Sequence, residues 1–389
     1  MNDSSLATAA LFTALSLLAG CTAAMPGVRT LPAPDVRTVD ALFADYANPE
    51  GPGASVVVIH EGRAVLSRAY GLAGLPERTP ATPRTHYRLA SLSKQFTAMA
   101  IMRLAEEGKL RYDDRVADVL PGFPAHASEV RIRHLLNHTS GVWDYEAFVP
   151  ETQSVQVKDR DVLELLSRAE RTHFPPGTAV RYSNSGYAVL ALIVEQVSGM
   201  PFARFLHERV FTPAGLRSTV AHEAGVSTVP QRAYGYVAET KGFRPRDQSP
   251  TSAVLGDGGI YSSVEELVAW DRALDTHALV TEATQQLAWT APTLPDGTSA
   301  RYGFGWFIDD DGGRPRLSHH GETSGFTNAI VKYPDQRLTV IVLTNRAGGE
   351  PWRLAQRIAD LWLDSPTKEG RPVSAAERPW PFESMPNAH

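Results

Sequence analysis

Runs of strand-forming residues lie near both ends of the chain, and segments with a helical period of apolar residues lie between them. Near the N-terminus, Ala54–His60 and residues 64–70 are joined by Glu61-Gly62, a pattern that predicts a β-hairpin. Further strands are predicted at residues 302–308, 316–320, 327–333 and 338–344. Helices are predicted at residues 38–46, 89–102, 130–138, 161–169, 186–197, 264–274 and 352–363. We therefore expect an α+β fold, in which N- and C-terminal strands form one antiparallel sheet with flanking helices beside a mostly helical lobe.

The predicted helix at 89–102 is apolar on most of its surface, which indicates that it is buried. Its first turn nevertheless contains Ser91 and Lys94, three residues apart and so on one face. A buried lysine must find a partner or lose its proton. A neutral amine beside a serine hydroxyl is a general base beside a nucleophile. The alternative is a helix-capping serine with a lysine that extends to water, and only the rest of the chain decides between them.

Two further motifs lie where a cleft between the sheet and the helical lobe would place them. Tyr182-Ser183-Asn184 precedes a predicted helix, and in an extended backbone the side chains of Tyr182 and Asn184 face the same side. His319-His320-Gly321 ends a predicted strand, and its glycine would let a substrate approach the backbone closely.

Three segments resemble, in their order and spacing, the three motifs of the serine penicillin-recognising enzymes. They are Ser91-Leu92-Ser93-Lys94, Tyr182-Ser183-Asn184 and His319-His320-Gly321. This family includes class C β-lactamases, DD-peptidases and related esterases. Supporting similarities lie at residues 135–141, 176–178, 258–263 and 325–326. The resemblance covers residues 38–363 and implies a β-lactamase/transpeptidase-like fold.

The resemblance also implies a covalent acyl-enzyme at Ser91, which water then releases. Lys94 and Tyr182 would handle the protons, and whether Lys94 or Tyr182 takes the serine proton stays open. Asn184 would hydrogen-bond the acyl side of the substrate and help to hold Lys94. The backbone N–H groups of Ser91 and Glu322 would form the oxyanion hole.

The third motif departs from the β-lactamase pattern. Those enzymes usually have Lys-Thr-Gly or Lys-Ser-Gly there, whose cation and hydroxyl bind a carboxylate. Here His319 and His320 precede Gly321, and a histidine is mostly neutral at pH 7. With Asn184, these three residues are the expected substrate contacts, and His319 would bind anionic substrates only when protonated.

We therefore rank a DD-peptidase or esterase, acting on an ester or a D-amino-acid-type peptide or amide, above a true β-lactamase. The alternative is a penicillin-binding sensor or binding protein that is acylated without turnover.

Composition and the remaining motifs narrow the expected partners. The net charge is −5 and no basic run stands out, so we expect a small-molecule or peptide substrate and no nucleic acid. His134 and His138 have the spacing of zinc ligands, but no glutamate follows His134, and we expect neither a metal nor a cofactor. Residues 309–313 lack the later glutamate of a calcium loop and predict a solvated turn.

The N-terminus resembles a lipoprotein signal. An apolar run at residues 6–20 is too short for a comfortable membrane span, and Leu18-Ala19-Gly20-Cys21 resembles a lipobox that would lipidate Cys21, the only cysteine. No Lys or Arg precedes the run, so a plain export signal or a start at Met25 are the alternatives. We expect a signal peptide at 1–20, a tether at 21–37, the hydrolase domain at 38–365 and a loose tail at 366–389. The protein would be exported to the periplasmic side of a bacterial membrane, held there only by the lipid on Cys21.

Overall fold

An antiparallel six-stranded sheet is the centre of the computed structural model, which describes residues 35–150 and 152–363. Its strands are β1 (Ala54–His60), β2 (Arg63–Tyr70), β10 (Phe307–Asp310), β11 (Pro315–Thr323), β12 (Phe326–Tyr333) and β13 (Leu338–Thr344). The spatial order β10-β11-β12-β13-β1-β2 places β1 beside β13, with Val57 opposite Ile341. The two ends of the chain therefore share one sheet, as the sequence predicted. The predicted signal peptide, Cys21 and almost all of the tether and tail lie outside the described residues.

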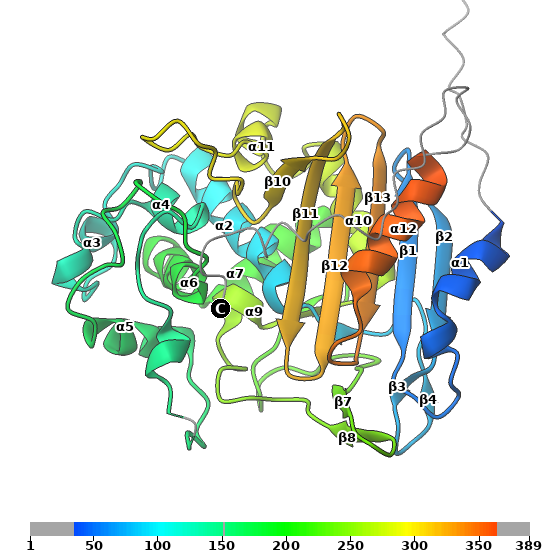
Figure 1. Cartoon of the computed structure of the whole chain (residues 1–389). Helices are drawn as coiled ribbons and strands as arrows, with labels where there is room; N and C mark the ends of the chain where they lie inside the picture. The colour runs from blue at the N-terminus through cyan, green and yellow to red at the C-terminus, as the bar shows by residue number, and fades with distance from the viewer. Residues whose placement is uncertain (1–34, 151, 364–389) are drawn as a thin grey trace, which may run out of the picture. The chain divides into compact units, whose positions relative to one another are not determined.

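Helices cover both faces of this sheet (Figure 1). On one face, α1 (Val36–Leu42) and α12 (Pro351–Leu363) pack with Val56 and Val340. On the other face, α10 (Val264–Asp275) and α2 (Lys94–Glu106) share a core with Ile341. Successive side chains of a strand face opposite sides, so β13 is buried along its whole length only because both faces are covered.

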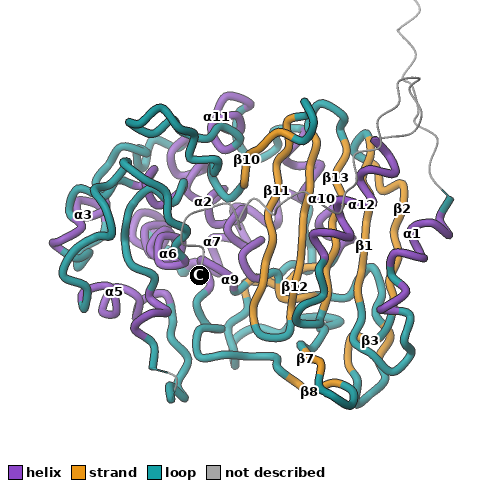
Figure 2. The backbone as a smooth tube through the Cα atoms, viewed as in Figure 1, coloured by secondary structure: helices purple, strands orange, loops and turns teal. Residues whose placement is uncertain are grey.

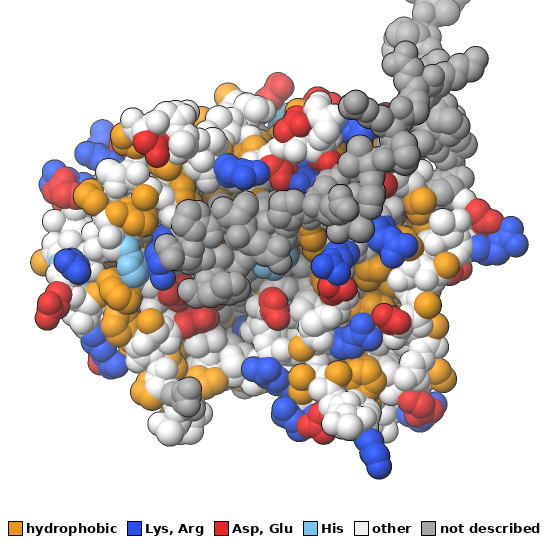
Figure 3. Space-filling view, in the orientation of Figure 1, with side chains coloured by type: hydrophobic (Ala, Val, Ile, Leu, Met, Phe, Trp, Pro, Cys, Tyr) orange, Lys and Arg blue, Asp and Glu red, His pale blue; other side chains and the backbone are white. Residues whose placement is uncertain are grey.

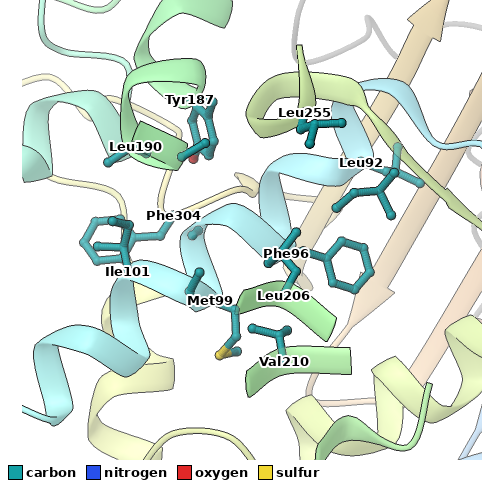
Figure 4. Packing of buried hydrophobic residues seen from close by; sticks show 14 of the residues in the cluster. Leu92, Phe96, Met99, Ile101, Tyr187, Leu190, Leu206, Val210, Leu255 and Phe304 are labelled. Atoms are coloured by element: carbon teal, nitrogen blue, oxygen red, sulfur yellow. The ribbon is translucent and has the colours of Figure 1, made fainter. Parts of the chain in front are cut away.

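The middle of the chain forms the helical lobe beside the sheet (Figure 2). Its helices are α3 (Val116–Val119), α4 (Ile132–Leu136), α5 (Asp159–Ser167), α6 (Asn184–Ser198), α7 (Phe202–Leu206), α8 (Thr212–Ala214), α9 (Leu255–Gly258) and α11 (Glu282–Ala288). Short strands outside the six-stranded sheet are β3 (Leu72–Gly74), β4 (Thr79–Pro80), β5 (Tyr87–Arg88), β6 (Val220–Ala221), β7 (Tyr236–Ala238), β8 (Phe243–Pro245) and β9 (Ile260–Ser262). Figure 4 shows Phe96 and Met99 of α2 packed among Leu206 and Val210, so α2 is the central helix of this lobe.

The longest helix of the lobe, α6, is buried from residue 185 to residue 194. Within the described residues, no single helix has the length and apolar character to cross a membrane. The pair formed by α6 and residues 202–214, bent by 79°, meets that test only jointly and only by length and composition. On the face shown in Figure 3, basic and acidic side chains are interspersed.

Several predicted elements differ from the structure in their bounds or type, three of them near the Ser91 turn. The predicted strand at 302–308 begins only at Phe307, because Gly305 takes a positive φ of 81° and turns the chain against α2. The predicted strand at 316–320 continues to Thr323. The predicted helix at 89–102 begins as a 3₁₀-helix, η2 (Ala90–Ser93), before α2 starts at Lys94.

The acidic segment that we predicted to be a solvated turn is partly buried. Asp309 pairs with Arg316 at 2.6 Å, and Asp311 lies 3.6 Å from the same guanidinium. Tyr333 also donates a hydrogen bond to Asp311 at 2.6 Å. The chain does bend at residues 311–314, with Gly312 and Gly313 exposed, but solvation was wrong for Asp309 and Asp311. Their compensating charge lies on the neighbouring strand, where pairing makes burial of a carboxylate tolerable.

Candidate active site

Ser91 and Lys94 meet at the junction of η2 and α2. Lys94 Nζ lies 3.0 Å from Ser91 Oγ. Lys94 has no exposed surface, whereas Ser91 is partly exposed. The turn before them is unusual, because Ala90 adopts a positive φ of 50°, which a residue other than glycine rarely does. The nucleophile candidate therefore faces solvent while the lysine is enclosed behind it.

Lys94 has two further partners, both acceptors from distant segments. Its Nζ lies 2.7 Å from Asn184 Oδ1 and 3.0 Å from the backbone oxygen of Asp257. Asn184 is the first residue of α6 and follows Ser183, whose backbone is extended. The structure thus brings three of the predicted site residues, Ser91, Lys94 and Asn184, into direct contact.

Tyr182 completes this group, with Lys94 Nζ 4.9 Å from the centre of its ring. Burial raises the pKa of Tyr182 well above its usual value, and a hydrogen bond between Tyr182 and Ser91 only partly opposes this. Burial lowers the pKa of Lys94 to about 8, although three nearby carboxylates raise it. These opposite shifts favour a neutral lysine beside a neutral tyrosine, because each charged form would lose its hydration.

The three carboxylates near Lys94 were not found by sequence reasoning, and they belong to Asp144, Glu146 and Asp257. Asp144 accepts the backbone N–H of Asn184 at 2.7 Å, and Glu146 Oε1 lies 3.4 Å from Asn184 Nδ2. Glu146 is exposed at the rim. Partial desolvation and the charge of Asp144 raise the pKa of the Glu146 carboxyl to about 7. No spacing rule marks these residues, since they come from segments that only the fold brings together.

The histidines of the third motif are placed differently from our expectation. His319 is fully buried, its Nδ1 donates to the backbone oxygen of His320 at 2.6 Å, and its Nε2 lies 2.8 Å from the hydroxyl of Tyr302. With the proton on Nδ1, the neutral ring accepts a hydrogen bond from Tyr302. Burial lowers the pKa of His319 well below its usual value and that of His320 to about 3. His319 is therefore a neutral, enclosed partner of Tyr302, and the expected protonated anchor for anionic substrates is corrected.

Gly321 brings β11 against the Ser91 turn. A side-chain Cβ at this position would lie 2.1 Å from the backbone oxygen of Leu89 and 3.1 Å from the backbone nitrogen of Ser91. This close approach places Glu322, the next residue of β11, at the same turn. The oxyanion hole formed by the N–H groups of Ser91 and Glu322 stays a prediction that this proximity supports.

The two histidines with zinc-like spacing have other hydrogen-bond partners. His134 Nδ1 accepts the N–H of Arg131, and His138 Nδ1 accepts the N–H of Ser183, each at 3.2 Å. Among residues 35–150 and 152–363, no three His, Cys, Asp or Glu side chains are grouped so that they could hold a metal ion. His138 instead packs against the ring of Tyr182, with 4.2 Å between the ring centres.

Comparisons with known proteins agree with this geometry. The profile of the family described as Beta-lactamase matches residues 39–361. Penicillin-binding protein 4* of Bacillus subtilis is 33% identical over 327 residues, which cover 80% of this chain and 72% of that protein. A D-aminopeptidase of Brucella anthropi is 31% identical over 331 residues, 84% of this chain but only 62% of the longer relative. The solved structure of an octameric penicillin-binding protein homologue from Pyrococcus abyssi superposes with a TM-score of 0.75 at 27% identity, covering 85% of this chain and 78% of that one.

The family profile extends from α1 to α12 and contains all three motifs, and the relatives share the fold as well as the sequence. The chain therefore belongs to the beta-lactamase family and is a serine hydrolase.

Proposed function

We propose that this hydrolase forms a covalent acyl-enzyme at Ser91 and acts on D-amino-acid amides or short peptides that carry a free amino group. The observation that supports the mechanism is the set of contacts around Lys94 Nζ, which has three oxygen atoms within 3.0 Å. A neutral amine has two N–H groups and one lone pair. It can donate to Asn184 and Asp257 while its lone pair accepts the proton of Ser91.

The acylation step follows from this arrangement. Ser91 Oγ attacks the substrate carbonyl, and its proton passes to Lys94. The N–H groups of Ser91 and Glu322 stabilise the negative oxygen of the tetrahedral intermediate. The bond to the leaving nitrogen then breaks as that nitrogen takes a proton from Tyr182, which recovers one from Lys94. Water releases the acyl group by the reverse proton path, so Ser91 regains its proton.

The same atoms could hold a lysine ammonium and a tyrosinate, which differ from the neutral pair only in where one proton lies. The pKa shifts favour the neutral pair, since burial lowers the pKa of Lys94 and raises that of Tyr182. We therefore assign Lys94 as the base that takes the serine proton and Tyr182 as the acid that protonates the leaving group.

The charges around the site support a substrate with an ammonium group. His319 and His320 supply no cation at neutral pH, whereas Glu146 and Asp144 lie beside Asn184. A β-lactam or a DD-peptide carries a carboxylate near the scissile bond, and a site that binds this carboxylate needs a cation. A free α-ammonium group needs a carboxylate. The similarity to a protein named D-aminopeptidase favours the same class of substrate.

Intact-mass measurement tests the nucleophile. The protein is mixed with a p-nitrophenyl ester, with D-alanine p-nitroanilide and with a β-lactam, and Ser91→Ala is compared with Ser93→Ala. Ser93 is the matched control, because its hydroxyl is buried and only accepts the N–H of Ile260 at 3.3 Å. A transient adduct that Ser91→Ala abolishes and Ser93→Ala retains supports the proposal. A β-lactam adduct that never turns over would favour a penicillin-binding sensor, and unchanged ester turnover in Ser91→Ala would contradict the mechanism.

The cellular location is a separate proposal, supported only by residues 1–21. We propose that the chain is exported and anchored by a lipid on Cys21. The mass of the N-terminal peptide from the membrane fraction should include a diacylglycerol on that cysteine. A Cys21→Ser variant that stays in the membrane fraction would contradict the anchor.

A further inference from the structure

Asp257 is a buried carboxylate beside the catalytic lysine, and the acylation steps use only its backbone oxygen. The residue is 7% exposed, and Oδ2 accepts a hydrogen bond from the hydroxyl of Tyr145 at 2.9 Å. Tyr145 is itself fully buried, and its backbone N–H donates to Ser185 at 2.7 Å. An isolated buried carboxylate is costly, so a carboxylate kept here requires a physical explanation.

The segment around Asp257 is held rigidly. Asp159 accepts the N–H groups of Leu255 and Gly256 at 2.8 and 2.9 Å, and Thr97 donates to the backbone oxygen of Gly256 at 2.7 Å. A Cβ on Gly256 would lie 2.4 Å from the backbone oxygen of residue 187, so the segment lies directly against α6. The position of Asp257 relative to α2 is therefore fixed by contacts that do not involve its own side chain.

We propose that Asp257, held by Tyr145, is a positioning residue whose negative charge sets the pH at which Lys94 becomes available as the base. This inference rests on the proposed role of Lys94. The backbone oxygen of Asp257 fixes the ammonium or amine at 3.0 Å, and its carboxylate, once ionised, attracts the proton that Lys94 holds.

The electrostatics agree with this geometry. Burial is the main cause that lowers the pKa of Lys94, and Asp257 is the largest of the opposing charges. Burial in turn raises the pKa of Asp257 to about 7, while the charge of Lys94 and the hydrogen bond from Tyr145 lower it. Removal of the carboxylate should therefore let Lys94 lose its proton at a lower pH.

Other groups also face this pair, and none replaces Asp257. Asp144 and Glu146 lie next to Asn184 and also raise the pKa of Lys94. Asp159 approaches Asp257 and raises its pKa. The remaining titratable neighbours of Lys94 are Tyr182, Tyr187, His138, His319 and His320.

The first test is the pH profile of Asp257→Asn, which keeps the shape of the side chain. The readouts are kcat/KM for p-nitrophenyl acetate and the rate at which a fluorophosphonate labels Ser91. The acid limb is the part of each profile in which the rate rises with pH. We expect it to shift to lower pH by about one unit in both profiles, since a charge within a few ångströms shifts a pKa by about that amount or more. The plateau should fall a few-fold, because a lysine with a lower pKa is a weaker base. A lowered plateau with an unmoved acid limb would show a merely structural role and overturn the proposal.

Tyr145→Phe supplies a second, milder perturbation in case Asp257→Asn does not fold. Without the hydroxyl, Asp257 ionises less readily, so the acid limb should move the same way but less. In the double variant, the loss of Tyr145 should add no further shift, because Tyr145 acts through Asp257. Additive shifts would overturn the coupling.

Asp159→Asn is the matched control, because it removes another buried carboxylate from the same segment. It should lower the melting temperature through loss of the contacts to Leu255 and Gly256, and leave the acid limb in place or move it slightly upward. A downward shift equal to that of Asp257→Asn would overturn the specific role.

The fluorophosphonate readout is independent of the substrate class, so a failure with D-amino-acid amides alone would leave this inference standing. Absence of any label on Ser91 would instead contradict the proposed mechanism.

Discussion

Gly321→Ala is the most direct test of how the sheet positions the nucleophile. The added methyl group would lie 2.1 Å from the backbone oxygen of Leu89, whereas real Cβ contacts essentially never fall under 3.0 Å. Strand β11 and the Ser91 turn would therefore have to separate by about 1 Å, a displacement that can reduce the rate of a reaction about 10²-fold. Loss of one oxyanion donor has a similar effect, about 10²–10³ in kcat.

We therefore expect kcat of Gly321→Ala on a p-nitrophenyl ester to fall about 10²-fold, with KM changed much less. Overpacking of this kind also costs about 1–3 kcal/mol of folding free energy, so the melting temperature should fall by several degrees. Steady-state kinetics and thermal unfolding monitored by circular dichroism measure the two effects separately.

Gly258→Ala is the matched control for this experiment. Gly258 faces the same turn from α9, but a Cβ there would lie 3.6 Å from Ala90, which is an ordinary van der Waals contact. Its kcat should stay within about threefold of wild type, since well-fitted small side chains rarely cost much. If Gly321→Ala keeps wild-type kcat, or if both variants lose activity equally, the close approach of β11 does not position the oxyanion hole.

Three further predictions concern charge. Glu146→Gln should raise KM about tenfold for D-alanine p-nitroanilide, since charge-assisted hydrogen bonds contribute about 1.5–3 kcal/mol and exposure reduces this; equal effects on the N-acetylated substrate would refute the amino-group contact. For a neutral ester, kcat/KM should rise through about pH 8 as Lys94 loses its proton and stay level to pH 10, and a limb near pH 6.5 would point to a histidine. Lys332→Met should cost about 3–5 kcal/mol in urea unfolding, because it leaves Asp271, 2.9 Å from Lys332 Nζ, as an unpaired buried charge. Recovery of stability in a double variant with Asp271→Leu would support that cause, and a Lys332→Met variant of wild-type stability would contradict it.

The parts of the fold that the sequence predicted depend on local pattern. The hairpin at Ala54–His60 and Arg63–Tyr70 and the strand Leu338–Thr344 were found because strand-forming runs end at clear turn residues. The predicted strand at 302–308 failed because Gly305 lets the chain turn against α2, a tertiary contact that no periodicity encodes. Single turns such as α9, with only four residues, carry too little pattern to be recognised.

Within the site, the sequence by itself determined the pair Ser91 and Lys94, because residues three apart in a helical turn must meet. The motif resemblance also pointed to Tyr182 and Asn184. Only the tertiary structure decided the charges around them. Asp257 is 163 residues from Lys94 in the chain and reaches it because α9 packs between α6 and the Ser91 turn.

The tertiary structure likewise decided the state of the third motif. From the sequence, His319 was a histidine with an ordinary pKa that could be protonated to bind an anion. In the folded chain it is enclosed, neutral and hydrogen-bonded to Tyr302. The reason is physical: spacing along the chain fixes which neighbours a residue can reach locally, but the protonation of a group depends on its burial and on charges that only the packed fold brings near it.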